Sequence, residues 1–271
     1  MDTILVATNF SKLSDNAVLY SASLAKQFKT KLILFNAFQI PLHASNTLLS
    51  VTSLNELIQK NKDKLNEIAL YLTKKFNIKV DYKCSYNSLD KEIDSLMNTY
   101  ASKLLVIGMS SKSIEQNLLG NPTTTLISMK KFPVLAIPIN AKFNGIKKIL
   151  FACDLMKHVP LKTLAKLRQL ATKLKSEVTV FYVDQKINEL KLNTKTLDYI
   201  GKELDDVTHL YKNVKSNTVI EEIEKEIKES NSELLVMIPK KYGFWESIIH
   251  KSKTRVMASG MNIPLLSIPI E

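Results

Sequence analysis

Cysteine and tryptophan are scarce in this chain of 271 residues, which has two Cys and one Trp. Cys84 and Cys153 form no Cys-x-x-Cys pair and have no neighbouring His, so neither a disulfide scaffold nor a zinc site is predicted. Glycine and proline are also few, with 6 and 8 residues, which excludes collagen-like and low-complexity chains. The apolar share of 45% and the charged share of 24% are typical of a packed globular protein. The length allows about two domains.

Long hydrophobic runs are absent as well. No stretch approaches the roughly 18 uninterrupted apolar residues of a membrane helix. Asp2 stands where a secretory signal would carry positive charge. We therefore expect a cytoplasmic protein with no membrane partner.

Arginine occurs only at Arg168 and Arg255, although 38 Lys+Arg against 26 Asp+Glu give a net charge of +12. Lysine lacks the planar fork with which arginine recognises bases and phosphates bidentately. The lysines mostly occupy polar positions of amphipathic segments such as Lys60 to Lys75. We expect a solvated basic surface and no specific nucleic-acid partner, with only weak polyanion association that salt removes.

Catalytic motifs are missing too. The chain has no Gly-x-Ser-x-Gly elbow, no His-Glu-x-x-His pair and no Walker loop. The four histidines are scattered, at His43, His158, His209 and His250. We therefore predict no enzyme, no catalytic residue and no metal site.

The chain does contain an internal repeat, because four segments of its first half recur in the same order in its second half. The matched pairs are Ile4–Asn9 with Ile149–Asp154, Leu24–Phe35 with Leu170–Phe181, Leu104–Ile107 with Leu234–Met237, and Phe132–Ile139 with Ile263–Ile270. This order indicates a tandem duplication. We predict two domains, residues 1–140 and 145–271, joined near Asn140 to Gly145.

The matched segments include short runs of Val, Ile and Leu, which is typical of parallel strands buried on both faces. Helical periods lie between the runs. In the first half we predict one helix after Asn9 with Ser14 as N-cap, one that begins at a capping box at Ser53–Glu56, one over about Ser88 to Tyr100, and one after Pro122. In the second half a helix begins at another capping box, Thr218–Glu221. Strands alternating with helices predict an α/β fold with a mostly parallel sheet. Ligands of such sheets bind beyond the carboxyl ends of the strands, here at Ala7 to Phe10, Asn36 to Phe38 and the loop after Ile107.

These segments together resemble the universal stress protein family. The resemblance rests on the turn Thr8-Asn9, the helix end Leu24-Ala25-Lys26, the strand Leu34–Ala37, the strand Leu104–Gly108, a glycine loop and the last strand Pro133–Pro138. It implies two tandem flavodoxin-like domains of the adenine nucleotide alpha hydrolase type, each a five-stranded parallel sheet sandwiched by helices. It also implies a non-enzymatic stress-response regulator. Some members of this family bind ATP through a loop with the pattern Gly-x2-Gly-x9-Gly-Ser/Thr.

The residues of the first half place a candidate adenine-nucleotide site at these strand ends. Gly108 ends a strand without a Cβ, and Gly120 precedes a helix start whose N–H groups suit phosphate oxygens. The candidate nucleotide-binding residues are Ala7, Thr8, Asn9, Ala37, Gly108, Met109, Ser111, Gly120, Asn121 and Thr123. The cofactor would be ATP or another adenine nucleotide, and the residues do not decide whether Mg²⁺ accompanies it.

Several departures from the family pattern leave an alternative open. Ser111 replaces the second glycine, and the loop to Gly120 is one residue shorter than the pattern. Pro122 removes one N–H donor, and Asn9 stands where ATP-binding relatives usually carry Asp. The first half therefore either binds the nucleotide weakly or has an empty pocket, in which case the protein is a ligand-free interaction module of the same fold.

The second half has lost more of the pattern. Ile238 and Lys251 stand in place of its two glycines, although Asp154 keeps the acidic position. Phe244 and Trp245 lie in the intervening loop, where they would fill the nucleotide volume, pack locally or face a partner. Any nucleotide is therefore expected in the first half only.

The last strands predict how the two halves associate. Val134–Ile139 and Leu265–Ile270 are matched apolar strands, and an uncovered apolar edge favours aggregation. The resemblance implies that relatives pair through these edges. We expect an internal pseudo-dimer of the two halves; the sequence also allows a homo-oligomer, and it indicates no particular protein partner.

Overall fold

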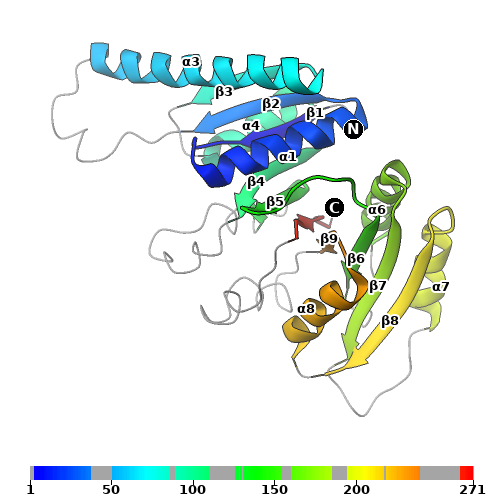
Figure 1. Ribbon diagram of the computed structural model, residues 1–271. Coiled ribbons are helices and arrows are strands. Elements are labelled where there is room, and N and C mark those ends of the chain that lie inside the picture. The colour runs from blue at the N-terminus through cyan, green and yellow to red at the C-terminus, as the bar shows by residue number, and fades with distance from the viewer. Residues whose placement is uncertain are drawn as a thin grey trace. The chain divides into compact units, whose positions relative to one another are not determined.

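A computed structural model describes residues 3–37, 51–85, 89–109, 126–127, 129, 131–153, 160–184, 194–216, 218–238 and 263–270. The chain divides into two compact units, formed mainly by residues 1–143 and mainly by residues 144–271. Each unit contains five strands with helices between them (Figure 1).

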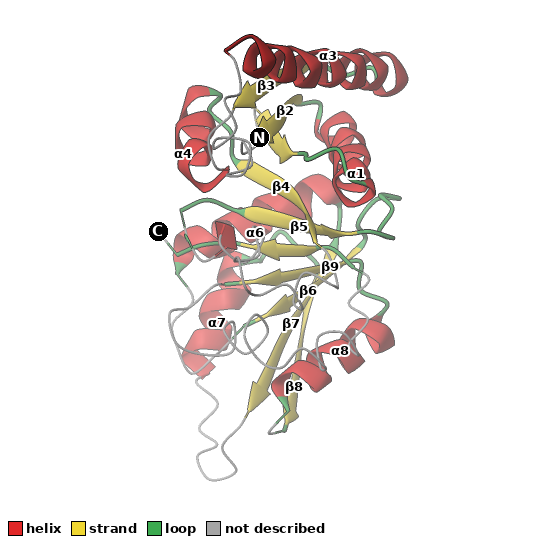
Figure 2. Ribbon diagram, turned by 90° about the vertical axis from the view of Figure 1, so that its left-hand side faces the viewer, coloured by secondary structure: helices red, strands yellow, loops and turns green. Residues whose placement is uncertain are grey.

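The first unit is a parallel sheet with the strand order β3-β2-β1-β4-β5. Figure 2 shows α1 and α3 on one face of this sheet and α4 on the other. The elements are β1 (Thr3–Ala7), α1 (Lys12–Phe28), β2 (Lys31–Ala37), α3 (Val51–Phe76), β3 (Val80–Ser85), α4 (Leu89–Thr99), β4 (Leu104–Met109) and β5 (Val134–Pro138).

The second unit repeats this arrangement, with the strand order β10-β9-β6-β7-β8. Its elements are β6 (Lys148–Ala152), α6 (Leu161–Leu174), β7 (Glu177–Asp184), α7 (Thr194–Glu203), β8 (His209–Lys215), α8 (Val219–Ser230), β9 (Leu234–Met237) and β10 (Leu265–Ser267). The predicted α/β fold with five parallel strands in each half is confirmed. The order 3-2-1-4-5 is that of Rossmann sheets, whereas flavodoxin itself has the order 2-1-3-4-5.

The duplication is visible in backbone detail. The N–H of Thr8, after β1, donates to Phe35 O at 2.8 Å, and the N–H of the matching Cys153 donates to Phe181 O at 3.0 Å. Helices α1 and α6 both end with a lysine in the left-handed region, at Lys29 and Lys175. The two halves therefore share local turns as well as their strand order.

The core of each unit consists of apolar strand residues with helices against both faces. Ile4, Leu5 and Val6 of β1 are fully buried, because β1 has a strand on each side and helices above and below. The outermost strands β3 and β8 are more exposed and carry charges. Lys212 of β8 forms an ion pair with the buried Glu226 of α8, and the hydrogen bond to Glu226 raises the pKa of Lys212. Inward-facing charge of this kind discourages further strand pairing at an edge.

The start of α1 differs from the sequence prediction by three residues. Its N-cap is Ser11, whose hydroxyl accepts the Ser14 N–H, while the Ser14 hydroxyl accepts the Ser11 N–H in return. Ser14 as N-cap is therefore wrong, since Ser14 occupies the third helical position of a capping box. The Ser-x-x-Ser spacing allows either serine to be the cap, and the turn after β1 favours the first.

Two other predicted helix starts also require correction. Helix α3 already includes Val51, so Ser53 lies inside the helix and cannot open it. Thr218 is the N-cap of α8 by position, but its hydroxyl bonds to Ser216 Oγ at 3.0 Å and caps no N–H. Helix α4 lies within one residue of its prediction at both ends. The helix expected after Pro122 falls largely outside the described residues.

No helix in the described ranges combines the length and the apolar character needed to cross a bilayer. The described residues also contain no group of three or more His, Cys, Asp or Glu side chains that could hold a metal ion.

Helix α1 also anchors the chain that leaves β5. The side-chain amide of Asn16 donates to Pro138 O at 2.8 Å and to Ala141 O at 2.9 Å. Tyr20, one turn further along α1, packs edge-on against Phe143 with the ring centroids 5.1 Å apart. One helix face thereby fixes residues 138–143 against the first unit.

We expect Asn16→Ala to destabilise the first unit by about 1–2 kcal/mol, because two partly buried carbonyl groups lose their donor. Urea denaturation followed by circular dichroism measures this. Ser23→Ala is the matched control on the same helix, since the Ser23 hydroxyl makes only an exposed bond to Leu19 O. Equal unfolding midpoints for the two variants would contradict the anchoring role of Asn16.

Candidate functional site

Six of the ten candidate residues lie at the carboxyl ends of three neighbouring strands. Ala7, Thr8 and Asn9 follow or end β1, Ala37 ends β2, and Gly108 and Met109 end β4. Since β1 pairs with both β2 and β4, the structure brings these residues to one edge of the sheet, at the switch in strand order. The other four, Ser111, Gly120, Asn121 and Thr123, lie outside the described residues, as do Asp154, Phe244, Trp245 and Lys251 of the second half.

The Ser14 hydroxyl organises the turn between β1 and α1. Ser14 is 6% exposed, and its Oγ accepts the N–H groups of Asn9 (3.3 Å) and Ser11 (3.1 Å). It also hydrogen-bonds to Thr8 Oγ1 at 3.1 Å and donates to Ser11 O at 3.0 Å. One buried hydroxyl therefore holds residues 8–11 from the inside. The spacing of Ser14 from Ser11 was the only sequence signal for this role.

Asn9 is exposed, and the oxygen of its side-chain amide is hydrogen-bonded. Asn9 Oδ1 accepts the Ser11 N–H at 3.2 Å and the Ser11 hydroxyl at 2.7 Å. Its Nδ2 has no partner among the residues that the structure describes. Asn9 therefore presents donors to a ligand, whereas an aspartate at this position would present only acceptors.

Phe10 adopts an unusual backbone conformation in the same turn. Its φ of +61° lies in the left-handed region, which bulky residues rarely enter. The Phe10 N–H donates to Thr8 Oγ1 at 3.1 Å, which helps to hold this geometry. Its ring faces the ammonium group of Lys64, with Nζ 4.5 Å from the ring centroid. Lys64 belongs to α3, so a cation from a distant segment reaches the candidate site.

Asn36 ties the ends of β2 and β3 to this turn. The side chain, on a residue only 2% exposed, donates from Nδ2 to Thr8 O at 2.8 Å. Asn36 Oδ1 accepts the Cys84 thiol at 3.8 Å. Burial raises the pKa of Cys84 against the opposing effect of Lys62 and Lys83, so the thiol stays protonated and able to donate. The sequence placed Asn36 in the region to search without identifying it as a site residue.

Gly108 has a packing role at this edge. A Cβ added to Gly108 would lie 2.7 Å from Leu13 Cγ and 3.1 Å from Leu13 O. The absence of a side chain thus lets the first turn of α1 approach β4. The sequence interpretation had assigned that space to a ribose or phosphate.

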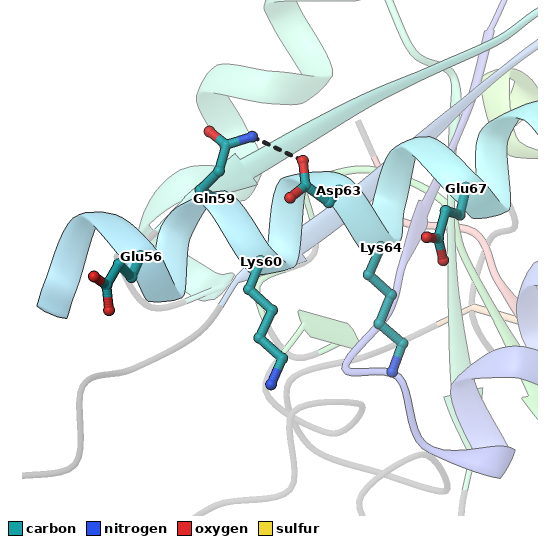
Figure 3. Close-up of a pocket in the computed structure, with 6 residues that line it drawn as sticks. All are labelled: Glu56, Gln59, Lys60, Asp63, Lys64 and Glu67. Carbon is teal, nitrogen blue, oxygen red and sulfur yellow. Dashed lines mark hydrogen bonds between the residues drawn. The ribbon is translucent and has the colours of Figure 1, made fainter.

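A hollow of about 450 Å³ lies beside the middle of α3 (Figure 3). It is lined by Glu56, Gln59, Lys60, Asp63, Lys64 and Glu67, with Gln59 Nε2 donating to Asp63 Oδ1 at 2.8 Å. Small-molecule pockets are mostly apolar. This lining is charged and carries three carboxylates against two lysines, so the hollow itself does not suit an anionic ligand.

Comparison with known proteins gives one family. The sequence profile of the universal stress protein family matches residues 1–138. No curated protein matches the chain at the level that marks relatedness.

Solved structures resemble the whole chain in fold. A universal stress protein from Archaeoglobus fulgidus DSM 4304 has a TM-score of 0.73 at 15% identity, covering 99% of this chain and 96% of that one. A functionally unknown protein from Pseudomonas aeruginosa PAO1 has a TM-score of 0.53 at 13% identity, covering 99% and 93%. At these identities the likeness concerns the fold alone.

A universal stress protein family protein from Arabidopsis thaliana was solved with AMP bound. It has a TM-score of 0.35 at 13% identity and covers 51% of this chain and 92% of its own. A likeness this low says nothing of the ligand of the present chain.

We expect Gly108→Ala to destabilise the protein by about 1–3 kcal/mol, because the new methyl group overpacks against Leu13. Gly201→Ala in α7 is the control, since its Cβ would meet two side-chain ends rather than backbone, the Tyr211 hydroxyl at 3.3 Å and His209 Nε2 at 3.9 Å. Alanine also favours the helix by up to about 1 kcal/mol relative to glycine, so this control is expected to be neutral or stabilising. Thermal unfolding measures both, and a Gly108→Ala variant as stable as wild type would contradict the packing role.

Proposed function

Because this chain belongs to the universal stress protein family, we propose that it is a cytoplasmic, non-enzymatic regulator of the stress response whose first half binds an adenine nucleotide weakly. The observation that carries the nucleotide proposal is the exposed amide of Asn9, at the switch between β1 and β4. Its Nδ2 donor is available at the edge where doubly wound sheets bind their ligands.

The chemistry of this edge fits a nucleoside. Adenine and ribose present nitrogen and oxygen acceptors, which match the Asn9 donor. Ala37 ends the neighbouring strand with a small side chain, so a flat base can approach the backbone. A neutral amide in place of a carboxylate weakens the binding, since one hydrogen bond to a charged group is worth roughly 1.5–3 kcal/mol. We therefore propose an affinity below that of ATP-binding relatives with Asp at this position.

A ligand-free interaction module is the second candidate, and two observations favour it. Leu13 occupies the space above Gly108, and Asn9 Oδ1 is already engaged by Ser11. Both features complete the turn without a ligand. The proposal includes no catalysis in either case, because the sequence contains none of the nucleophile, metal or phosphate motifs described above.

We also propose that the two halves, residues 1–140 and 145–271, pair as a pseudo-dimer through their last strands. Within its own unit, β5 pairs with β4, and β10 pairs with β9. Each strand therefore has one edge without a partner in its unit, and both strands are apolar. Pairing these edges would remove an aggregation hazard.

Calorimetric titration with ATP tests the nucleotide proposal. We expect one site per chain, abolished by Gly120→Val and unchanged by Asp154→Ala, which alters the position matching Asn9 in the second half. Binding that survives Gly120→Val but is lost with Asp154→Ala would assign the site to the second half and contradict the proposal. The absence of binding at millimolar ATP would favour the interaction module.

Amide hydrogen exchange of the whole chain tests the pairing. A strand with partners on both sides protects every N–H group, whereas an edge strand protects only alternate ones. We expect continuous protection along Val134–Ile137 and Leu265–Ser267, and alternating protection along the outer strands β3 and β8. Alternating protection along β5 and β10 would refute the pairing.

A further inference from the structure

We propose that Lys64 of α3 recognises an anionic phosphate group of the ligand at the β1–α1 turn, and so makes the site selective for phosphorylated nucleosides. This inference rests on the proposed nucleotide binding and adds a residue that lies outside the strand ends and the glycine loop. It concerns the turn formed by Thr8 to Ser11 and the helix that passes it.

The turn places the Phe10 ring beside Lys64. Phe10 carries a strained backbone, and such strain of about 1–3 kcal/mol persists only where the surroundings determine it. Here Thr8 Oγ1 accepts the Phe10 N–H, and Ser14 holds both Thr8 and Asn9. The ring therefore has a defined place, and the Lys64 ammonium lies 4.5 Å from its centroid. A cation held in this way loses less side-chain entropy on meeting an anion than a freely rotating lysine does.

Lys64 faces the aromatic ring of Phe10 rather than a carboxylate. Among the residues that the structure describes, no carboxylate forms an ion pair with it. Glu67, one turn along α3, lines the same hollow, and Figure 3 shows Lys60 and Lys64 extending from one side of the helix. Asp63 lines the hollow too, and its Oδ1 accepts the Gln59 side-chain amide. Lys64 is thus a cation that lies against the Phe10 ring and forms no ion pair with the part of the chain that the structure describes.

Two neighbouring features favour a positive potential at this turn, against the carboxylate of Asp15 in the first turn of α1. Asn9 is neutral where ATP-binding relatives usually have Asp, so no carboxylate at that position opposes Lys64. The first turn of α1 begins at Lys12, and a helix N-terminus carries partial positive charge. The neutral side chain of Asn9 and the charge of Lys64 act in the same direction. Together they favour a ligand with phosphate charge over the uncharged nucleoside.

The experiment compares ATP with adenosine, because the two share the base and ribose and differ in phosphate charge. Calorimetric titrations use the full chain as wild type, Lys64→Gln and Lys62→Gln. Lys62 is an exposed lysine on the same helix, about 200° around the helix axis from Lys64. We expect Lys64→Gln to weaken ATP binding about 10-fold or more and to leave adenosine binding within about twofold of wild type. Lys62→Gln is expected to change neither, and thermal unfolding checks that both variants fold.

Each other outcome is decisive. Equal losses for ATP and adenosine in Lys64→Gln would mean that Lys64 only supports the fold of the turn. Equal losses of ATP affinity in both variants would indicate unspecific charge attraction. Wild-type protein that binds both ligands, with ATP binding unaffected by Lys64→Gln, would overturn this inference and leave the proposed function standing. Wild-type protein that binds neither would overturn both.

Discussion

Strand β1 pairs with β2 on one side and with β4 on the other, and the candidate site depends on this double pairing. The chain reaches β2 and β3 by crossovers on one face of the sheet, and α4 then crosses on the other face to β4. The chain therefore adds strands on one side of β1 first and on its other side afterwards. The residues after β1 thus lie at the switch point between β1 and β4, and they form the turn in which Thr8, Asn9 and Phe10 lie.

The turn is closed by polar side chains buried beneath it. Ser14 and Asn36 satisfy backbone groups of residues 8–11 that the sheet and the helix leave unpaired. A buried donor or acceptor without a partner costs about 1–3 kcal/mol, so these side chains allow an irregular segment to lie against the core. The same bonds hold Phe10 in a conformation that a bulky residue avoids. These hydrogen bonds belong to the scaffold and form without a ligand.

The two halves keep one architecture while a residue at a strand end differs. Strand order, the backbone bonds of Thr8 and Cys153, and the left-handed residues after α1 and α6 are kept in both units. Gly108 of β4 corresponds to the buried Ile238 after β9. Gly108 leaves space for Leu13 in the first unit, whereas the second unit has a branched side chain at the corresponding position. Packing thus constrains the strands in both halves, while the strand ends diverge.

The sequence by itself determined the fold class, the duplication and the strand ends at which a site would form, because apolar runs buried on both faces and helical periods are local patterns. It also located Ala7, Thr8, Asn9, Ala37, Gly108 and Met109 at those ends. It misplaced the cap of α1 and the start of α3, since two serines or a short polar run offer equivalent caps. Only the tertiary structure decided that Gly108 makes room for Leu13, that Asn36 reaches Thr8, and that Lys64 meets Phe10. These contacts join segments far apart in the chain, and no local spacing encodes a distance that the packing of helices on a sheet sets.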